Sequence, residues 1–356
     1  MTRTHPTTEL TVPQTQKAAI IEKSGDSVKI VEKSVVQASE LKPGEVLVKV
    51  LYSGVCHTDV HIAEGALGDP PIKPLVGGHE GTGVIVAIGE GTQTPLSIGQ
   101  AVGINWSART CLSCQACIRG TGNEAMCPDI KCSGFTVEGT FQQYAVRHAT
   151  HIIPIPDTPV TFGGSNSLRR DIRALKQSDM EPGDVVVITG AGGGLGHLAV
   201  QYAINAFGLR VIAIDTGDNK KELCLKLGAE NFIDFKVKNV HKQKSGNVAD
   251  EVKRITDGAG AHAVLVTSSA TNGYEGVLDY LRPCGRLLAL GATIGCKIDI
   301  DVITCISRSI TIKGMVIGNR AIAHQALDIS ARGRVNTVCR IEPLAKLSEI
   351  FEELKS

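Results

Sequence analysis

One stretch of the chain constrains the fold more than any other: a run of β-branched apolar residues that leads into closely spaced glycines. The run is Val185–Thr189, and Gly190, Gly193 and Gly196 follow it at intervals of three residues. Apolar residues at helical spacing then extend to Ala206. Because a continuous apolar run is typical of a buried parallel strand, the stretch predicts a strand, a tight turn and a helix.

This predicted turn has the properties of a pyrophosphate site. Glycines leave no Cβ atoms in the way of a ligand, while backbone N–H groups and the positive end of the helix dipole attract phosphates. A second expected strand ends in Asp215, at roughly the 20-residue distance expected of a carboxylate that binds a ribose. NAD(H) is favoured, because this carboxylate repels the 2′-phosphate of NADP(H); the alternative is that Asp215 only caps a helix. The predicted cofactor contacts here are Gly190, Gly193, Gly194, Leu195, Gly196 and Asp215.

Length and composition limit the class of protein. A chain of 356 residues, 42% of them hydrophobic, predicts two packed domains. The net charge of +1 and the 4% of aromatic residues favour a small-molecule partner over nucleic acid or a membrane surface. Residues 1–16 are polar, resemble no leader sequence and are expected to form a disordered arm. Eleven cysteines without a leader predict reduced thiols in a cytoplasmic protein without a transmembrane span.

Two regions with different patterns follow the arm. The first is β-rich, with strands expected at 18–21, 28–31 and 45–51. From about residue 184 to 314 strands and helices alternate, which predicts a doubly wound parallel sheet. Its further strands are expected at 210–215, 231–235, 263–267, 285–291 and 310–314, and its helices at 220–227, 248–256 and 273–281. Two more helices are expected at 323–332 and 344–354.

The β-rich region carries a candidate catalytic metal site. Cys56 and His79, with Glu80 next to the histidine, supply the thiolate, imidazole and carboxylate that bind a catalytic zinc with one position left open. Asp59 could orient the imidazole of His79, and Glu80 could approach the metal when no substrate is bound.

The strongest metal signal is a cluster of four cysteines. Cys111, Cys114 and Cys117 are spaced by three residues, and Cys127 follows ten residues later. Four thiolates form the closed tetrahedral site of a structural zinc, so we predict a zinc lobe over about 105–132. Cys132 is expected to be a buried bystander. The histidines at 148, 151, 241 and 262 are expected on the surface or in loops.

The motifs around these residues resemble a known family. Gly-Val-Cys-His-Thr-Asp at 54–59, Gly-His-Glu-Gly at 78–81 and the cysteine cluster are similar to those of the zinc-dependent medium-chain alcohol dehydrogenases, closest to the yeast and fungal type. The resemblance extends over nearly the whole chain from Lys17. It implies an α/β chain with a GroES-like β-rich catalytic domain and a doubly wound Rossmann domain that binds NAD. The implied domains are 17–172, 173–316 for NAD, and a return to the catalytic domain at 317–356.

The same resemblance implies roles for individual residues. Cys56 and His79 would bind the catalytic zinc, while Thr58 and His61 would pass the alcohol proton to solvent. His57 would contact the pyrophosphate of the cofactor. Further implied cofactor contacts are Lys220, Thr267 and Leu290. The implied reaction is hydride transfer between NAD and an alcohol, aldehyde or ketone, and the implied assembly is a homodimer or homotetramer.

In three places the chain departs from the family pattern. Relatives carry Pro-Ile-Leu-Cys-Ala-Gly in the segment that matches 161–173, and its cysteine is the third catalytic zinc ligand. Here that segment contains neither cysteine nor histidine, and Arg169, Arg170 and Arg173 replace an apolar helix. The cysteine lobe is two residues longer, and relatives continue beyond the position of Ser356, so a truncated C-terminus is expected.

The missing ligand leaves alternatives open. One hypothesis is that residues 165–170 are an out-of-frame reading of the ligand segment, because some codon choices read Pro-Ile-Leu-Cys-Ala one base later; sequencing the transcript tests it. Another is a zinc-free NAD(P)H reductase of the same superfamily. A third is a catalytically impaired nucleotide-binding protein that keeps only its structural zinc. Trp106 matches an aromatic that narrows the substrate pocket of relatives that use ethanol, whereas the stretch at 66–69 lacks a second one. This favours a substrate that is larger than ethanol or differently shaped.

Overall fold

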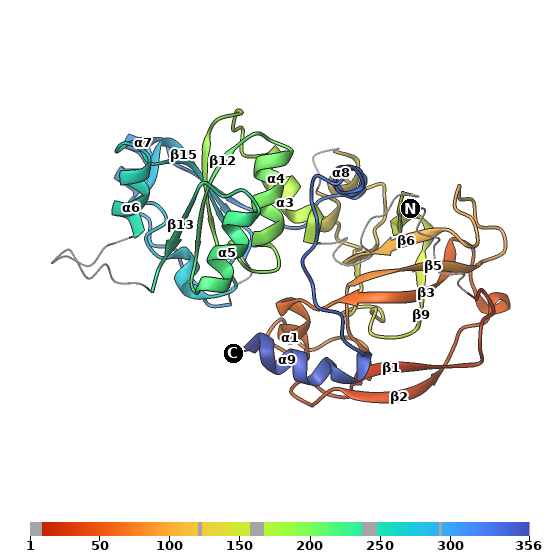
Figure 1. Ribbon diagram of the computed structural model, residues 1–356. Helices are drawn as coiled ribbons and strands as arrows, with labels where there is room; N and C mark the ends of the chain where they lie inside the picture. The colour runs from red at the N-terminus through yellow and green to blue at the C-terminus, as the bar shows by residue number, and fades with distance from the viewer. Residues whose placement is uncertain (1–8, 120–122, 157–166, 237–247, 292–293, 356) are drawn as a thin grey trace. The chain divides into compact units, whose positions relative to one another are not determined.

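Two compact units make up the chain. A computed structural model describes residues 9–119, 123–156, 167–236, 248–291 and 294–355 (Figure 1). The first unit consists of Met1–Asn166, Gly318–Ala331 and Cys339–Ser356, and the second of Ser167–Ile317 and Arg332–Val338. The first boundary therefore lies six residues before the expected 172/173 boundary. Residues 332–338, expected in the first unit, belong to the second.

Antiparallel sheets build the first unit. Its five-stranded sheet has the order β10-β6-β5-β3-β9 and its three-stranded sheet the order β2-β1-β4, while β7 pairs with β8. The strands are β1 (Thr15–Ile21), β2 (Lys29–Ser34), β3 (Glu45–Gly54), β4 (Leu75–Val76), β5 (Glu80–Ile88), β6 (Ala101–Ile104), β7 (Ser107–Arg109), β8 (Lys131–Cys132), β9 (Tyr144–His148) and β10 (Ile153–Pro154). β1 begins inside the expected disordered arm and buries Gln16, so the expectation of disorder up to residue 16 was wrong there; residues 1–8 lie outside the described residues.

Short helices surround these sheets. They are α1 (His57–Ala63), α2 (Gln115–Ile118), α8 (Arg320–Ala331) and α9 (Leu347–Lys355), with 3-10 turns η1 (Ala38–Glu40), η2 (Glu124–Met126), η3 (Ala149–His151) and η5 (Leu344–Lys346). The last helix, α9, lies beside α1 (Figure 1). Its Leu347 and Phe351 are buried in one core cluster with Ala18, Val60 and Phe141. Residues from both ends of the chain therefore share one hydrophobic core.

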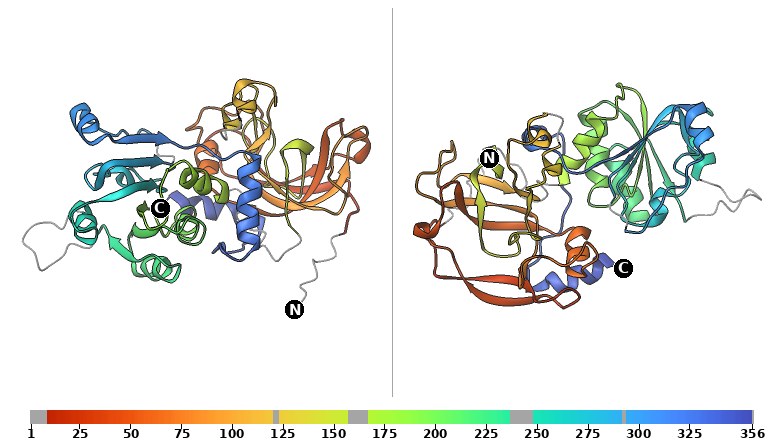
Figure 2. Two further views of the ribbon diagram at one scale, coloured as in Figure 1. Left: turned by 90° about the horizontal axis from the view of Figure 1, so that it is seen from above. Right: turned by 180° about the vertical axis from the view of Figure 1, so that it is seen from behind.

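A six-stranded parallel sheet forms the centre of the second unit. Its order is β13-β12-β11-β14-β15-β16. The strands are β11 (Val185–Thr189), β12 (Arg210–Asp215), β13 (Asn231–Asp234), β14 (Ala261–Val266), β15 (Leu281–Ala289) and β16 (Thr311–Gly314). The helices are α3 (Ser167–Lys176), α4 (Gly196–Asn205), α5 (Asp218–Lys226), α6 (Val248–Ile255) and α7 (Val302–Arg308). Helices cover both faces of the sheet (Figures 1 and 2).

This topology confirms the expected doubly wound fold. The strand order reverses between β11 and β14, which is the place where such sheets bind ligands at the carboxyl ends of their strands. Alternate residues of β11 face opposite sides, and Val185 and Val187 pack in the core cluster that includes Ala249 and Val252 of α6. Among the described residues, no helix combines the length and the apolar character that crossing a bilayer requires.

The helix expected at 273–281 was wrong. The structure has a 3-10 turn, η4 (Thr271–Tyr274), followed by turns, and β15 begins at Leu281. Gly276 has φ of +62°, in the left-handed region, which stops a right-handed helix. The apolar spacing that suggested a helix arises because Val277, Tyr280 and Leu281 are all buried in the same core cluster.

Candidate active site and metal centres

Strand pairing brings the expected catalytic zinc ligands together. In the antiparallel pair of β3 and β5, Gly54 lies opposite Glu80. Cys56 follows two residues after that pair and His79 comes directly before it. One ligand atom each from Cys56, His79 and Glu80 therefore lie within 4.8 Å of one another. A thiolate, an imidazole and a carboxylate at this separation fit a zinc ion with an open fourth position.

Asp59 fixes the orientation of this group. Its Oδ2 atom accepts a hydrogen bond from the backbone N–H of Cys56 at 2.9 Å, at the start of α1, and its Oδ1 atom lies 2.8 Å from Nδ1 of His79. Burial by itself lowers the pKa of His79, but the charge and hydrogen bond of the Asp59 carboxylate outweigh burial and raise this pKa well above its usual value. The hydrogen bond holds the proton on Nδ1 and leaves Nε2 for a metal.

Besides Asp59, three polar residues of α1 have expected roles, and they occupy different environments. The hydroxyl of Thr58 lies 3.7 Å from the sulfur of Cys56. His61 has a buried Nε2 atom without a hydrogen-bond partner among the described residues. His57 is half buried, and burial lowers its pKa in spite of a hydrogen bond to the backbone of Leu354 in α9. Trp106 packs edge-on against His79, with ring centroids 5.3 Å apart.

The four cysteines of the expected zinc lobe also converge. Their sulfur atoms all lie within 4.8 Å of one another, with 3.5 Å between Cys114 and Cys117 and 3.6 Å between Cys111 and Cys127. Four sulfurs around a zinc with bonds of about 2.3 Å are separated by about 3.8 Å, so the cluster fits a tetrahedral ion. The backbone N–H groups of Ser113 and Cys114 lower the pKa of the Cys111 thiol to about 6. Cys132 is buried outside this cluster, as expected.

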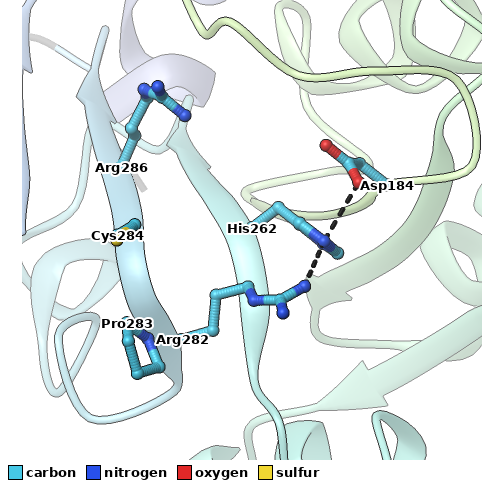
Figure 3. A pocket seen from close by; sticks show the side chains of 6 residues that line it. All are labelled: Asp184, His262, Arg282, Pro283, Cys284 and Arg286. Carbon is cyan, nitrogen blue, oxygen red and sulfur yellow. Dashed lines mark hydrogen bonds and ion pairs between the residues drawn. The ribbon is translucent and has the colours of Figure 1, made fainter. Parts of the chain in front are cut away.

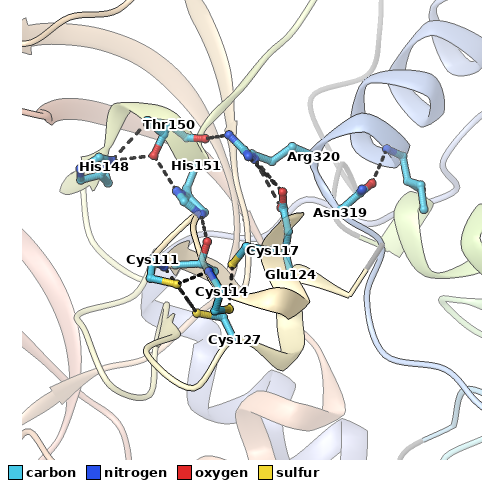
Figure 4. Close-up of polar contacts among 12 residues, drawn as sticks. Cys111, Cys114, Cys117, Glu124, Cys127, His148, Thr150, His151, Asn319 and Arg320 are labelled. Atoms are coloured by element: carbon cyan, nitrogen blue, oxygen red, sulfur yellow. Dashed lines mark hydrogen bonds and ion pairs between the residues drawn. The ribbon is translucent and has the colours of Figure 1, made fainter. Parts of the chain in front are cut away.

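Other side chains join the cysteine lobe to the rest of the first unit. These contacts were not predicted from the sequence. Arg320 of α8 pairs with Glu124 of η2 at 3.0 Å. His151 (Figure 4), expected on the surface or in a loop, is buried, and its Nε2 atom lies 2.9 Å from the hydroxyl of Thr110. His151 is therefore not a surface residue, although it lies in the 3-10 turn η3 between β9 and β10. No local pattern marks these partners, because they are far apart in the sequence.

The glycine turn of the second unit has the geometry of a phosphate-binding loop. Gly190 has φ of +72°, and a Cβ atom on Gly196 would lie 2.0 Å from the carbonyl oxygen of Gly190. Only glycine at 196 lets α4 start this close to β11. Gly193, Gly194 and Leu195 complete the turn, and apart from its chain neighbours no described residue has an atom within 4 Å of the Cβ position of Gly194.

His197 supports this turn, a role that sequence reasoning missed. Its Nδ1 atom lies 3.0 Å from the carbonyl oxygen of Gly193, and its Nε2 atom accepts a hydrogen bond from the backbone N–H of Val338 at 3.1 Å. Burial lowers the pKa of His197, which keeps the ring neutral with one donor and one acceptor nitrogen. The imidazole therefore links the glycine turn to residues 332–338.

Asp215 lies beside the same turn. Its Oδ2 atom accepts a hydrogen bond from the N–H of Gly192 at 2.9 Å, and its Oδ1 atom lies 2.8 Å from the ammonium of Lys220. The hydroxyl of Thr267 donates to the carbonyl of Thr189 at 2.7 Å, and the N–H of Leu290 donates to Val266 at 3.0 Å. All the expected cofactor residues of the second unit thus belong to β11, β12, β14, β15 and the segments that follow these strands.

The segment without a third zinc ligand is only partly described. Residues 157–166 lie outside the described residues, and the rest of the segment 161–173 belongs to α3, which begins at Ser167. In α3, Arg173 donates to the carbonyl of Ile317 at 2.7 Å, and Arg170 lies 3.4 Å from the carbonyl of Leu290. Asp171 is fully buried, and neither of its carboxyl oxygens has a hydrogen-bond partner among the described residues.

One pocket lies outside these sites. Asp184, His262, Arg282, Pro283, Cys284 and Arg286 line it (Figure 3). The Nε2 atom of His262 lies 3.0 Å from Oδ1 of Asp184, and Arg286 pairs with Asp179 at 3.3 Å. These residues lie at or near the starts of β11, β14 and β15, whereas the glycine turn follows the end of β11.

Two models of protein families match parts of this chain. Residues 42–157 match the model of the alcohol dehydrogenase GroES-like domain, and residues 194–332 match that of the zinc-binding dehydrogenases. An alcohol dehydrogenase of Schizosaccharomyces pombe is 39% identical over 351 residues, which cover 96% of this chain and 95% of that protein. Alcohol dehydrogenase 1 of Neurospora crassa is 39% identical over 348 residues, which cover 96% and 94%.

Solved structures show the same likeness. The alcohol dehydrogenase of Aeropyrum pernix has a TM-score of 0.81 at 27% identity, covering 95% of this chain and 96% of its own. The acetophenone reductase of Geotrichum candidum, solved with NAD, has a TM-score of 0.79 at 26% identity, covering 97% and 95%. A GroES-like domain joined to a nucleotide-binding sheet defines an oxidoreductase. The chain belongs to the zinc-dependent medium-chain alcohol dehydrogenases, which confirms the expected family and fold class.

Proposed function

We propose that the chain interconverts an alcohol and an aldehyde or ketone by hydride transfer to or from NAD(H), with zinc at Cys56, His79 and Glu80. The observation that carries the proposal is Asp59, which bonds both the backbone N–H of Cys56 and the imidazole of His79. Zinc bound there supplies a Lewis acid for the substrate oxygen. The buried carboxylate of Asp59 orients the two ligands that would hold the zinc ion.

Glu80 takes a larger part in this proposal than in the family pattern. Segment 161–173 contains no cysteine or histidine. A carboxylate oxygen of Glu80 lies within 4.8 Å of the ligand atoms of Cys56 and His79. Three protein ligands with an open fourth position are the usual set of a catalytic zinc. We therefore propose Glu80 as the third ligand, which leaves the open position for substrate.

The residues of α1 would handle the proton of the alcohol. Thr58 carries a hydroxyl 3.7 Å from the sulfur of Cys56, where a substrate oxygen would bind. His61 follows one turn later with a buried and unsatisfied Nε2 atom, which favours proton transfer over a structural hydrogen bond at that atom. His57, at the start of α1, is proposed to face the cofactor phosphates, which requires its hydrogen bond to Leu354 to be exchanged.

NAD(H) rather than NADP(H) is the proposed cofactor. The buried carboxylate of Asp215 is held by Gly192 and Lys220 at the end of β12. A ribose hydroxyl can donate to this carboxylate, whereas a 2′-phosphate would meet its negative charge. Gly190, Gly193, Gly194, Leu195 and Gly196 would hold the pyrophosphate, and Thr267 and Leu290 would border the nicotinamide.

Zinc content and alcohol-dependent reduction of NAD⁺ together test this function. We expect about two zinc ions per chain by elemental analysis, and about one after His79→Ala, because the cysteine lobe keeps its own ion. Absorbance of NADH, followed with a panel of primary and secondary alcohols, should rise only with the unaltered chain. One zinc per chain together with NADH oxidation by a quinone would favour the reductase instead. One zinc with neither activity would favour the impaired nucleotide-binding protein.

Self-association is proposed through the second unit. β16 is an edge strand of the six-stranded sheet. The neighbouring helix α7 exposes Val302, Ile303 and Ile306 at 65%, 71% and 69% of their surfaces. An edge strand beside an apolar helix face fits a second copy of the chain better than water. Light scattering should give a dimer or tetramer, and Ile303→Glu with Ile306→Glu should reduce its mass to that of the monomer; an unchanged mass contradicts this surface.

The cytoplasm is the proposed location. The lobe can bind zinc only through four reduced thiols, and the cysteines described in the structure are free. Localisation of a fluorescent fusion to an oxidising compartment would contradict the proposal.

A further inference from the structure

A partly buried ion pair joins the turn next to Cys127 to a helix nearly 200 residues away. The guanidinium of Arg320, at the start of α8, contacts both carboxyl oxygens of Glu124 at 3.0–3.3 Å. Its remaining nitrogen donates to the carbonyl of Thr150 at 3.0 Å. The side chain of Glu124 is only 11% exposed. A fork of this kind is the strongest geometry for an arginine and a carboxylate.

Glu124 lies three residues before Cys127 in η2, and the N–H of Cys127 donates to the carbonyl of Glu124 at 3.1 Å. The carboxylate that Arg320 holds and the fourth thiol of the cluster therefore lie at the two ends of one short turn.

A second path reaches the other end of the cysteine cluster. The hydroxyl of Thr150 lies 2.8 Å from Nδ1 of His151 (Figure 4). Nε2 of His151 lies 2.9 Å from the hydroxyl of Thr110. Thr110 comes directly before Cys111. The turn η3 is thus linked through His151 to Thr110, the neighbour of the first cysteine, and through Arg320 to Glu124, near the last.

Helix α8 belongs to a different unit from the residues that flank it in the chain. Gly318–Ala331 belongs to the first unit, but the residues on both sides of it, up to Ile317 and from Arg332, belong to the second. The side chain of Asn319 accepts from the N–H of Ile322 at 3.0 Å and so caps the helix. The ion pair of Arg320 with Glu124 therefore attaches the first turn of α8 to the rest of the first unit. The chain enters the first unit at this end of the helix.

We propose that Glu124 and Arg320 are positioning residues that hold the cysteine lobe closed, so that metal retention in the lobe and the order of α8 are coupled. The proposal rests on the zinc lobe of the proposed function. If Arg320 is removed, Glu124 is left as a buried charge without its partner, and hydrating that charge requires η2 to move. Cys127 moves with it. Coupling is reciprocal, so loss of the metal must also weaken the attachment of α8.

The first test measures zinc release into a coloured chelator from the full chain. All variants carry His79→Ala, so that the lobe holds the only zinc. Arg320→Met should release zinc about tenfold faster or more, the range found when groups that orient metal ligands are lost. Arg320→Lys, which restores one hydrogen bond, should give an intermediate rate. Arg340→Met is the matched control, because Arg340 pairs at 2.7 Å with Glu353 in the same unit but on an exposed surface.

A double substitution separates this mechanism from general loosening of the fold. Adding Glu124→Gln to Arg320→Met removes the stranded charge, so zinc should leave the double variant more slowly than the Arg320→Met variant. General loosening predicts equal or faster release, and that result, or a wild-type rate for Arg320→Met, would overturn the proposal.

Hydrogen exchange tests the reverse direction without altering the ion pair. Removing zinc from the His79→Ala chain should lower amide protection across residues 322–331, whereas unchanged protection of α8 would contradict the coupling. A His79→Ala chain that is folded but isolated without zinc would refute the zinc lobe itself, and with it the proposed function of the cysteines.

Discussion

Asp171 offers the sharpest test of how the unusual α3 segment is accommodated. Its side chain is fully buried in the second unit, and neither oxygen has a hydrogen-bond partner among the described residues. Burial raises its pKa well above the usual value, although the charge of Arg170 opposes this shift. A buried polar group without a partner costs about 1–3 kcal/mol. Asp171→Val removes that cost and adds about 1 kcal/mol of apolar burial.

The removed desolvation cost and the added apolar burial together predict that Asp171→Val stabilises the chain by about 3 kcal/mol. For a unit of this size the melting temperature should then rise by about 6–12 °C. Thermal unfolding followed by circular dichroism measures this change. Glu222→Val is the control, because Glu222 is an exposed residue of α5, and substitution of exposed residues changes stability little.

The pH dependence of the same variant identifies the cause. Since the folded state raises the pKa of Asp171, it binds this proton more tightly than the unfolded chain does. The resulting stability is fully present below the unfolded pKa near 4 and is lost as pH rises toward the folded pKa. The advantage of Asp171→Val over the unaltered chain should therefore grow from about pH 4 upward. A variant that melts no higher, or an advantage that is the same at every pH, would refute the reasoning.

Three further substitutions test the sites. Asp59→Asn should weaken zinc binding about 10- to 100-fold in a chelator competition, because it removes the charge that orients His79; unchanged affinity would mean that the carboxylate is not needed. Gly196→Ala should abolish NADH binding measured by fluorescence titration, because the new Cβ atom would lie 2.0 Å from the oxygen of Gly190; tight binding would place the cofactor elsewhere. Asp215→Ala should reduce the preference for NADH over NADPH by about tenfold or more, and an unchanged ratio of the two dissociation constants would exclude Asp215 as the selecting residue.

Strands with clear ends were predictable from the sequence. The stretch 210–215 is a run of apolar residues between a glycine-containing turn and an acid, and the structure has β12 at those residues. The cysteine cluster was equally clear, because close spacing within the chain largely determines that these thiols meet. The convergence of Cys56 with His79 needed the family resemblance, since it depends on the register of β3 against β5.

Contacts between distant segments could not be predicted. Arg173 looked misplaced in a buried helix, but it donates to the carbonyl of Ile317, 144 residues away. Glu124 and Arg320 are 196 residues apart, and neither stands out in composition or spacing. The false helix at 273–281 has the same origin, because apolar spacing does not distinguish a helix from turns that bury the same side chains.

The first unit consists of three separate segments of the chain, so the ribosome makes its last segment long after its first. Its Ala18, Val60 and Phe141 are covered by Leu347 and Phe351, and 190 residues follow Asn166, the end of its first segment. At typical elongation rates these residues take roughly 10 to 40 s to be made. During that time the nascent first segment holds apolar side chains that Leu347 and Phe351 do not yet cover, and we expect chaperones to bind there. Deleting residues 347–355 should leave this surface open permanently, so that a newly made chain stays bound to chaperones where the full chain is released.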